Sequence, residues 1–193
     1  ALLLYKNESD SLLTQLQAKN SRLKEASFVD AMTGLPRLTK GDQLFSARLS
    51  QWKENDEQVA VMYLDLDEFK VINKVYGHES GDWCIKETAG RLEKVIDGHG
   101  YAMRIGSDEF LLVYHGFDLK MHAISWATKM LSELQAPIAL ENVNLKISSS
   151  VGIAFYPEDG ETLSALRRKA DLAMYRAKLD ESLSISTYKS ATT

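Results

Sequence analysis

The chain has 193 residues, 45% of them hydrophobic and 26% charged, so it can bury one full core without disulfide bonds or a structural metal. Its formal net charge of -4 argues against nucleic acid as a partner. The single cysteine, Cys84, excludes an internal disulfide and suits a reducing compartment. No run approaches the roughly 20 apolar residues that span a bilayer. We expect a cytoplasmic location, either free or as the cytoplasmic part of a larger membrane-anchored protein.

The first predicted element is a helix over residues 7–28, a segment without Gly or Pro. Its apolar residues follow one seam of a heptad pattern, which Lys19 interrupts. A parallel dimer stalk and a helix lying on its own domain are both open. We therefore divide the chain into a coiled-coil-like signalling helix at 1–29 and one domain at 30–193.

The domain begins with a turn-rich segment, and patterns of helix and strand then alternate. Helices are predicted at 39–55, 69–75, 81–96, 119–134 and 163–178, and strands at 59–64, 101–105, 110–114, 145–155 and 183–188. Gly106 and Ser107 separate two of these strands and suit a type II′ turn. Because at least one strand pair is a tight hairpin, we predict an α/β fold with a mixed, largely antiparallel sheet flanked by helices.

Acidic residues follow the apolar strand at 59–64. Asp65 and Asp67 are two apart, so both side chains project from one side of a strand. Oxygen ligands grouped in this way suit Mg²⁺ that also bridges to substrate phosphates. The alternative is that these acids end a buried strand and solvate a turn. Asp108 and Glu109, just past the predicted turn, favour the metal, because acids gathered at one sheet edge repel each other unless a cation neutralises them.

Three further polar residues are candidates for nucleotide recognition. Lys70 and Asn73 are three apart on a predicted helix and so share a face. Lysine provides a point charge for phosphate, and the Asn amide offers a donor and an acceptor to a base edge. Asp82 has two readings: a cap for the next helix, or an acceptor for the donors of a guanine edge.

Six segments carry a resemblance to a known family, namely 30–36, 64–70 with Asn73, 77–82, 104–110, 150–154 and 170–178. In this order and spacing they closely resemble the successive signatures of GGDEF domains of the diguanylate cyclase family. The similarity covers about residues 30–188. Any one of these motifs is weak, but six in series are specific.

The resemblance implies a palm-like fold shared with nucleotidyl cyclases, and condensation of two GTP molecules to cyclic di-GMP by two domains that meet as a homodimer. It implies Mg²⁺ (or Mn²⁺) held by Asp65, Asp108 and the Leu66 carbonyl. It implies substrate contacts from Asn73, Asp82, Lys70, Lys178, Gly106 and Ser107. Catalytic roles fall on Glu109, which would activate the 3′-hydroxyl, and on Lys70 and Asp108.

The chain departs from the family pattern at four places. Ser107 replaces the second glycine of the signature, and its side chain would fill space that glycine leaves for substrate. Ser182 stands where the family often has a phosphate-contacting arginine, and Arg176 could substitute for it. The segment 97–100 lacks the Arg-x-x-Asp charges of an inhibitory product site. The Asn-Arg pair that usually follows the first motif is here Arg37-Leu38, which shifts an arginine or removes its ion pair.

Three functional hypotheses follow. The preferred one is a regulatory module that binds GTP and Mg²⁺ but condenses GTP poorly, attached to a phosphodiesterase or sensor domain. The second is an active diguanylate cyclase without product inhibition. The third, ranked last, is a structural dimerisation domain, which would have no evident reason to keep the acidic cluster.

Overall fold

The computed structural model describes residues 14–16, 19, 28–140, 143–180 and 183–189. Most of the predicted 7–28 helix lies outside these residues, although 14–16 and Lys19 are helical. Its two packing alternatives and the division between 29 and 30 therefore remain predictions.

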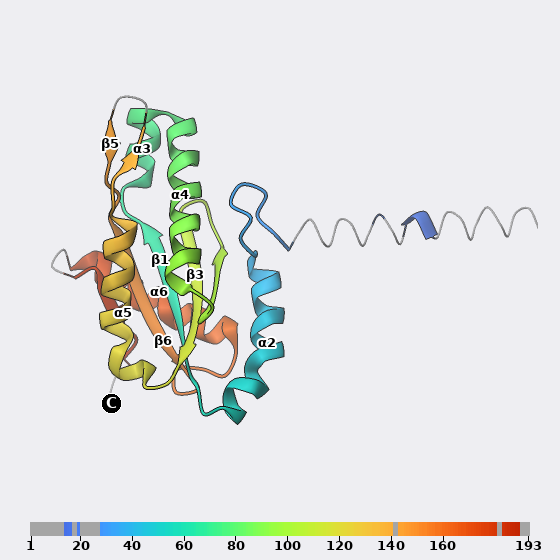
Figure 1. Cartoon of the computed structure of the whole chain (residues 1–193). Helices are drawn as coiled ribbons and strands as arrows, with labels where there is room; N and C mark the ends of the chain where they lie inside the picture. The colour runs from blue at the N-terminus through green and yellow to red at the C-terminus, as the bar shows by residue number, and fades with distance from the viewer. Residues whose placement is uncertain (1–13, 17–18, 20–27, 141–142, 181–182, 190–193) are drawn as a thin grey trace, which may run out of the picture.

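Helices and strands are interspersed along the chain from residue 38 onward (Figure 1). The helices are α2 (Leu38–Glu54), α3 (Phe69–Tyr76), α4 (His78–Ile96), α5 (Leu119–Leu134) and α6 (Leu163–Leu179). The strands are β1 (Gln58–Leu66), β2 (Gly100–Arg104), β3 (Glu109–Gly116), β4 (Ile138–Ala139), β5 (Asn144–Leu145), β6 (Ser149–Tyr156) and β7 (Ile185–Thr187).

The prediction of one continuous strand at 145–155 was wrong, because the structure divides this segment between β5 and β6. β5 pairs with β4 in a small separate hairpin that the sequence did not predict. Both strands of that hairpin have two residues, too few to carry an alternating pattern. The α4 helix also starts three residues earlier than predicted, at His78.

The main sheet has the order β2-β3-β1-β6-β7. The β2–β3, β3–β1 and β1–β6 pairs are antiparallel, and the β6–β7 pair is parallel. The prediction of a mixed, largely antiparallel sheet flanked by helices is confirmed.

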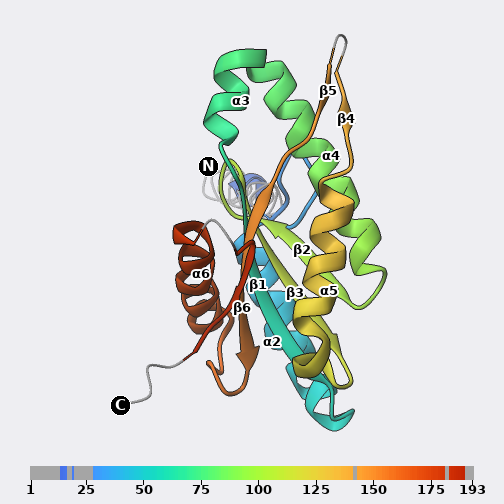
Figure 2. The ribbon, with the colours of Figure 1, turned by 90° about the vertical axis from the view of Figure 1, so that its left-hand side faces the viewer.

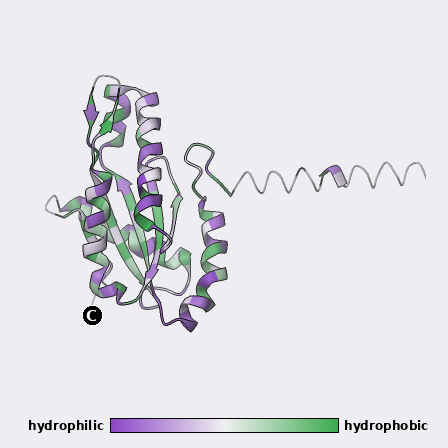
Figure 3. Ribbon diagram, viewed as in Figure 1, coloured by the Kyte–Doolittle hydropathy of each residue, from purple (hydrophilic) through white to green (hydrophobic). Residues whose placement is uncertain are grey.

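Two hydrophobic clusters lie on opposite faces of this sheet. One contains residues of α4 and α5, and the other contains residues of α2 and α6. Figure 2 shows α5 and α6 on opposite sides of the sheet, and Figure 3 shows that the helices carry both hydrophilic and hydrophobic residues. The apolar faces of the helices cover both sides of the strands, so the strands form the core.

β1 is the central strand, and its sequence explains where the polar rim begins. All residues from Val59 to Leu64 are buried, because helices cover both faces of the sheet. Asp65 is the first partly exposed residue after this run. The helix α6, which packs against β1 and β6, begins at a Thr162 cap whose Oγ1 accepts a hydrogen bond from the Ala165 amide at 3.2 Å. It carries Lys178 to the same rim.

Candidate nucleotide and metal site

The acids at the end of β1 and the start of β3 lie side by side. Asp65 is the register partner of Glu109 in the antiparallel β1–β3 pair. One step further, the Leu66 amide donates a hydrogen bond to the Asp108 carbonyl at 3.1 Å. Acids that are about 43 residues apart in the chain therefore meet at one edge of the sheet, as the sequence predicted from two neighbouring strands.

Lys178 neutralises part of this acidic edge from α6. Its Nζ donates to Asp65 Oδ1 at 2.5 Å and lies 4.0 Å from Asp67 Oδ1. Asp67 also accepts a hydrogen bond from Ser150 Oγ at 2.8 Å. Lys178 was predicted to contact phosphate. In the structure its ammonium group instead contacts the carboxylates of Asp65 and Asp67.

The electrostatic surroundings of Asp65 disfavour its ionised form. Burial raises the pKa of Asp65 above its ordinary value, and the Lys178 contact only partly offsets that effect. The negative charges of Asp108 and Glu109 raise this pKa further. A carboxylate held among like charges in this way favours an added cation.

The connection between β2 and β3 is not the predicted type II′ turn. It runs over the four residues 105–108, and Gly106 is absent from the described glycines with positive φ, which are Gly34, Gly77 and Gly98. The Arg104 side chain sets the loop instead. Its Nε donates to the Gly106 carbonyl at 3.1 Å and its Nη2 to the Ser107 carbonyl at 2.8 Å.

Arg104 is held in turn by Asp30. Arg104 Nη1 donates to Asp30 Oδ1 at 3.0 Å, and Thr33 Oγ1 donates to the same oxygen at 2.8 Å. Arg37 Nη2 lies 3.4 Å from Asp30 Oδ2. The shifted arginine at position 37 therefore keeps an ion pair. Asp30 and Arg104 connect the first motif to the signature loop, a contact that sequence reasoning did not assign although both residues stand in the quoted motifs.

Two residues of the signature loop crowd its acids. Ser107 Oγ donates to Asp108 Oδ1 at 2.5 Å. A Cβ on Gly106 would come within 2.1 Å of Glu109 Oε2 and 3.1 Å of Glu109 Cβ. A side chain at position 106 would therefore force the Glu109 carboxylate to move, although Gly106 has no positive φ.

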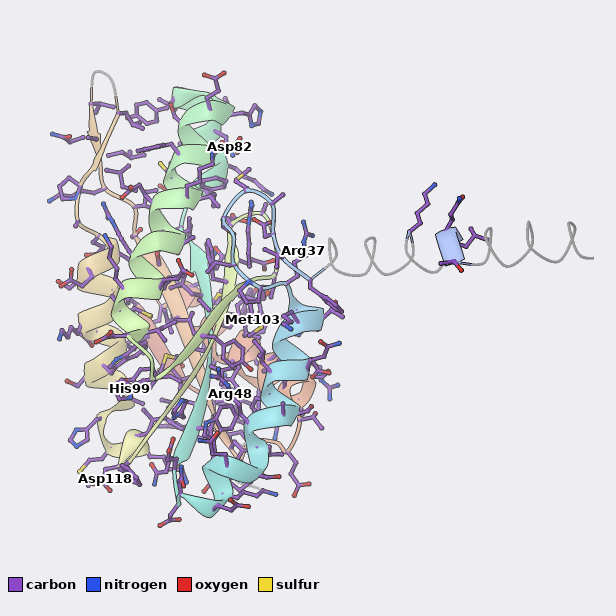
Figure 4. All side chains as sticks on the ribbon, turned by 45° about the vertical axis from the view of Figure 1, so that its right-hand side comes forward. Arg37, Arg48, Asp82, His99, Met103 and Asp118 are labelled. Carbon is purple, nitrogen blue, oxygen red and sulfur yellow. The ribbon has the colours of Figure 1, made fainter. Side chains whose placement is uncertain are left out.

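Asn73 lies against α4 where α3 packs on it. A Cβ on Gly81 would meet Asn73 Oδ1 at 1.9 Å, so the glycine leaves room for the amide at the residue that precedes Asp82. Asp82 does not cap the helix, which starts four residues earlier after Gly77, and its side chain is exposed on α4 (Figure 4). Lys70 is also exposed, three residues before Asn73 on α3.

The fit of this edge to a divalent cation can be judged from its donors. In the described part of the chain no three His, Cys, Asp or Glu residues form a group able to hold a metal alone. Asp65 and Asp108 supply two carboxylates, which suits Mg²⁺, an ion that usually takes one or two carboxylates and completes its shell with water and phosphate oxygens. The donors therefore fit a metal that arrives with a phosphorylated ligand.

Comparison with known proteins identifies the class to which this fold and site belong. A family model described as diguanylate cyclase, GGDEF domain, matches residues 27–182. The chain belongs to the GGDEF family, whose diguanylate cyclases are generally metal-dependent, and it is a GGDEF domain of cyclic di-GMP signalling.

Named relatives and solved structures agree with this assignment. The chain is 34% identical to the diguanylate cyclase TpbB of Pseudomonas aeruginosa over 89% of its own length and 40% of TpbB. It is 34% identical to the bifunctional diguanylate cyclase/cyclic di-GMP phosphodiesterase MucR of the same species, over 86% of the chain and 24% of MucR. A solved structure of a truncated TpbB that comprises only its GGDEF domain superposes with a TM-score of 0.77 at 32% identity, covering 83% of this chain and 94% of that one.

The relatives are much longer than this chain. It spans about a fifth to a quarter of the first three curated relatives that it matches. One similar structure, from Caulobacter crescentus, is described as a sensory box/GGDEF family protein, with a TM-score of 0.75, 36% identity, and coverage of 79% of this chain and 98% of that one. None of the helices within the described residues is long and apolar enough to cross a membrane.

Proposed function

We propose that this domain binds GTP together with Mg²⁺ (or Mn²⁺) and acts as a regulatory nucleotide-binding module, with poor condensation of GTP to cyclic di-GMP. The observation that carries the proposal is the crowding of Asp65. Its carboxylate has two acidic neighbours and one lysine, a balance that a divalent cation would correct.

The chain's own residues would divide the work of binding. Asp65, Asp108 and the Leu66 carbonyl would hold the cation, which would supply charge neutralisation to the phosphates. Lys70 and Lys178 would contact phosphate as point charges. Lys178 would have to exchange its 2.5 Å contact with Asp65 for phosphate oxygens.

Guanine recognition rests on the junction of α3 and α4. The Asn73 amide lies against Gly81, and Asp82 is free of a capping role because the helix begins upstream of it. A carboxylate accepts from the two N–H donors of a guanine edge, and an amide can both donate and accept. Adenine offers a different donor pattern, so this pair of side chains favours GTP over ATP.

The case for poor turnover rests on the signature loop. Ser107 Oγ donates to Asp108 Oδ1, so one oxygen of a proposed metal ligand is already engaged. Phosphoryl transfer depends on alignment, and a displacement of about 1 Å can cost on the order of 10²-fold in rate. Arg176 lies over the Tyr188 ring, with its guanidinium carbon 6.0 Å from the ring centroid, which argues against its replacing the arginine missing at Ser182. Residue 182 itself lies outside the described residues.

Calorimetric titration with a non-hydrolysable GTP analogue and Mg²⁺ tests the binding proposal. We expect saturable heat that EDTA abolishes and that an ATP analogue does not reproduce. A titration without heat, together with no displacement by GTP, would refute it.

An active cyclase without product inhibition is the second candidate, favoured by the presence of Asp65, Asp108, Asn73 and Asp82. Comparing cyclic di-GMP yield from the natural chain and from Ser107→Gly, both joined to a fused dimerising zipper, separates the two. We expect a yield gain of about 10²-fold in the variant. High yield from the unchanged chain would favour the active cyclase instead.

Partners outside the domain belong to the same proposal. Residues 1–29 would serve as the signalling and dimerising helix, and an attached phosphodiesterase or sensor domain would receive the effect of GTP binding. The relative MucR is named as a bifunctional protein with diguanylate cyclase and cyclic di-GMP phosphodiesterase activities. A purely structural domain is ranked last, and the GTP-analogue titration would favour it only by showing no binding.

A further inference from the structure

Tyr63 lies under the acidic edge and touches one of its acids. It stands on β1, two residues before Asp65, and is 7% exposed within the cluster that α2 and α6 cover. Its hydroxyl donates a hydrogen bond to Glu109 Oε1 at 2.8 Å. Because a buried hydroxyl without a partner is costly, this contact fixes the carboxylate as well as the tyrosine.

Glu109 could face another way without this contact. As register partners, Glu109 and Asp65 project from the same face of the sheet, where the Cβ atoms of such a pair are about 4.5–5.5 Å apart. The Glu109 side chain is long enough to reach either Asp65 or the diagonal position of Tyr63. It takes the diagonal one, and the Gly106 backbone closes over it so tightly that a Cβ there would meet Oε2 at 2.1 Å.

The number of acids available to a cation follows from this choice. Glu109 is hydrogen-bonded to Tyr63, and the described residues contain no group of three His, Cys, Asp or Glu that could hold a metal. Asp65 and Asp108 remain, a pair that depends on phosphate oxygens to complete a magnesium shell. A third carboxylate beside them would let the edge bind a cation without nucleotide.

We propose that Tyr63 is a positioning residue that holds the Glu109 carboxylate out of the cation position between Asp65 and Asp108, and thereby makes cation binding depend on the nucleotide. This inference rests on the proposed function, since it assigns the metal to the same edge. It adds a residue from the hydrophobic core to that site and a reason for its position in β1.

The test is titration of the metal alone, Mn²⁺ without nucleotide, into the whole chain. Tyr63→Phe keeps the ring and removes the hydroxyl, so Glu109 is free to join the other two acids. We expect the affinity for Mn²⁺ to rise by about tenfold, as an added carboxylate ligand raises the charge of a cation site. In the double variant Tyr63→Phe with Glu109→Gln this gain should disappear.

Tyr101→Phe is the matched control. Tyr101 is a partly buried tyrosine that packs against the same hydrophobic cluster as the buried Tyr63, and its hydroxyl donates to the Gly41 carbonyl at 2.9 Å. Tyr101→Phe should lower stability by an amount similar to Tyr63→Phe and leave Mn²⁺ affinity unchanged. If Tyr63 had a merely structural role, the two variants would have the same Mn²⁺ affinity.

Two outcomes would overturn the inference: unchanged Mn²⁺ affinity in Tyr63→Phe, or a gain that survives in the double variant. Should Tyr63→Phe fail to fold, Glu109→Asp provides the same test with the tyrosine intact, because the shorter side chain cannot span to the hydroxyl and should raise Mn²⁺ affinity in the same direction. The titration of the natural chain with the GTP analogue reports separately on the proposed function. A Glu109-dependent gain without GTP binding would support the inference and refute that function.

Discussion

Two aspartates near the signature loop, Asp30 and Asp65, have opposite electrostatic environments. Burial acts on both, yet Asp30 has a pKa below its ordinary value, because hydrogen bonds from Thr33 and Arg104 outweigh the burial. Asp65 has a pKa above its ordinary value, because burial and the charges of Asp108 and Glu109 outweigh the contact from Lys178. Asp30 is satisfied within the fold, whereas Asp65 is not.

This difference separates a structural acid from a candidate ligand. Asp30 uses its oxygens to hold Arg104, which holds the loop carbonyls of Gly106 and Ser107. Asp65 is left with one lysine and like-charged neighbours. A charged group whose ionised form the fold disfavours indicates a binding site.

The largest expected effect is on ligand affinity at Asp65. Asp65→Asn removes one of two carboxylates and should weaken Mg²⁺-dependent binding of a GTP analogue by about 100-fold or more, equivalent to about 2.7 kcal/mol. Its thermal transition without metal should stay at or above that of the natural chain, because like-charge repulsion is relieved. Calorimetric titration and thermal melting measure both, and an unchanged affinity would remove the metal assignment.

Asp30→Asn should show the reverse pattern. It should lower the stability of the fold, whereas Asp65→Asn should lower the affinity for the ligand. It leaves the Arg104 guanidinium, 13% exposed, without its charged partner, at a cost of about 2 kcal/mol. For a domain of this size that corresponds to a drop of about 4–8 °C in Tm. Thermal melting without ligand is the measurement. If Asp30→Asn and Asp65→Asn lowered Tm equally, the contrast between the two acids would be lost.

The dependence of metal-free stability on pH should also differ between the two acids. The lowered pKa of Asp30 contributes stability above its unfolded value of 3.8, and this is lost as the pH falls through the still lower folded value. The raised pKa of Asp65 acts the other way, because its protonated form is favoured by folding and stability falls as the pH rises from 3.8 through the folded value. The measurement is the free energy of unfolding in denaturant, for the natural chain and for Asp65→Asn, from about pH 3 to about pH 7. Relative to Asp65→Asn, in which the Asp30 contribution is unchanged, the natural chain should lose stability as the pH rises.

The smallest effect is expected at Arg37. Its side chain is 51% exposed and lies 3.4 Å from Asp30, whereas Arg104 is 13% exposed and closer. Solvent-exposed ion pairs contribute about 0.2–1 kcal/mol, so Arg37→Ala should lower the free energy of unfolding by less than about 0.5 kcal/mol. Denaturant unfolding of Arg37→Ala and Asp30→Asn checks this. An equal loss in both variants would mean that Arg37, rather than Arg104, is the main partner of Asp30.

Much of the fold and part of the site could be predicted from local pattern. The buried run of β1 ends where Asp65 begins, and the sheet class followed from one hairpin among alternating helices and strands. The hairpin turn was wrong because Arg104, rather than a glycine with positive φ, sets the loop. The β4–β5 hairpin was missed because two-residue strands have no periodicity to detect.

The sequence by itself determined the order of the motifs, the class of the sheet and the residues that stand at its polar edge, because these depend on neighbours a few positions apart. Tertiary structure alone decided which acid meets which partner. Asp30 meets Arg104 across 74 residues and Tyr63 meets Glu109 across 46, and a contact of that separation exists only once the strands have paired. The charge balance that distinguishes Asp65 from Asp30 is a property of the folded chain for the same reason.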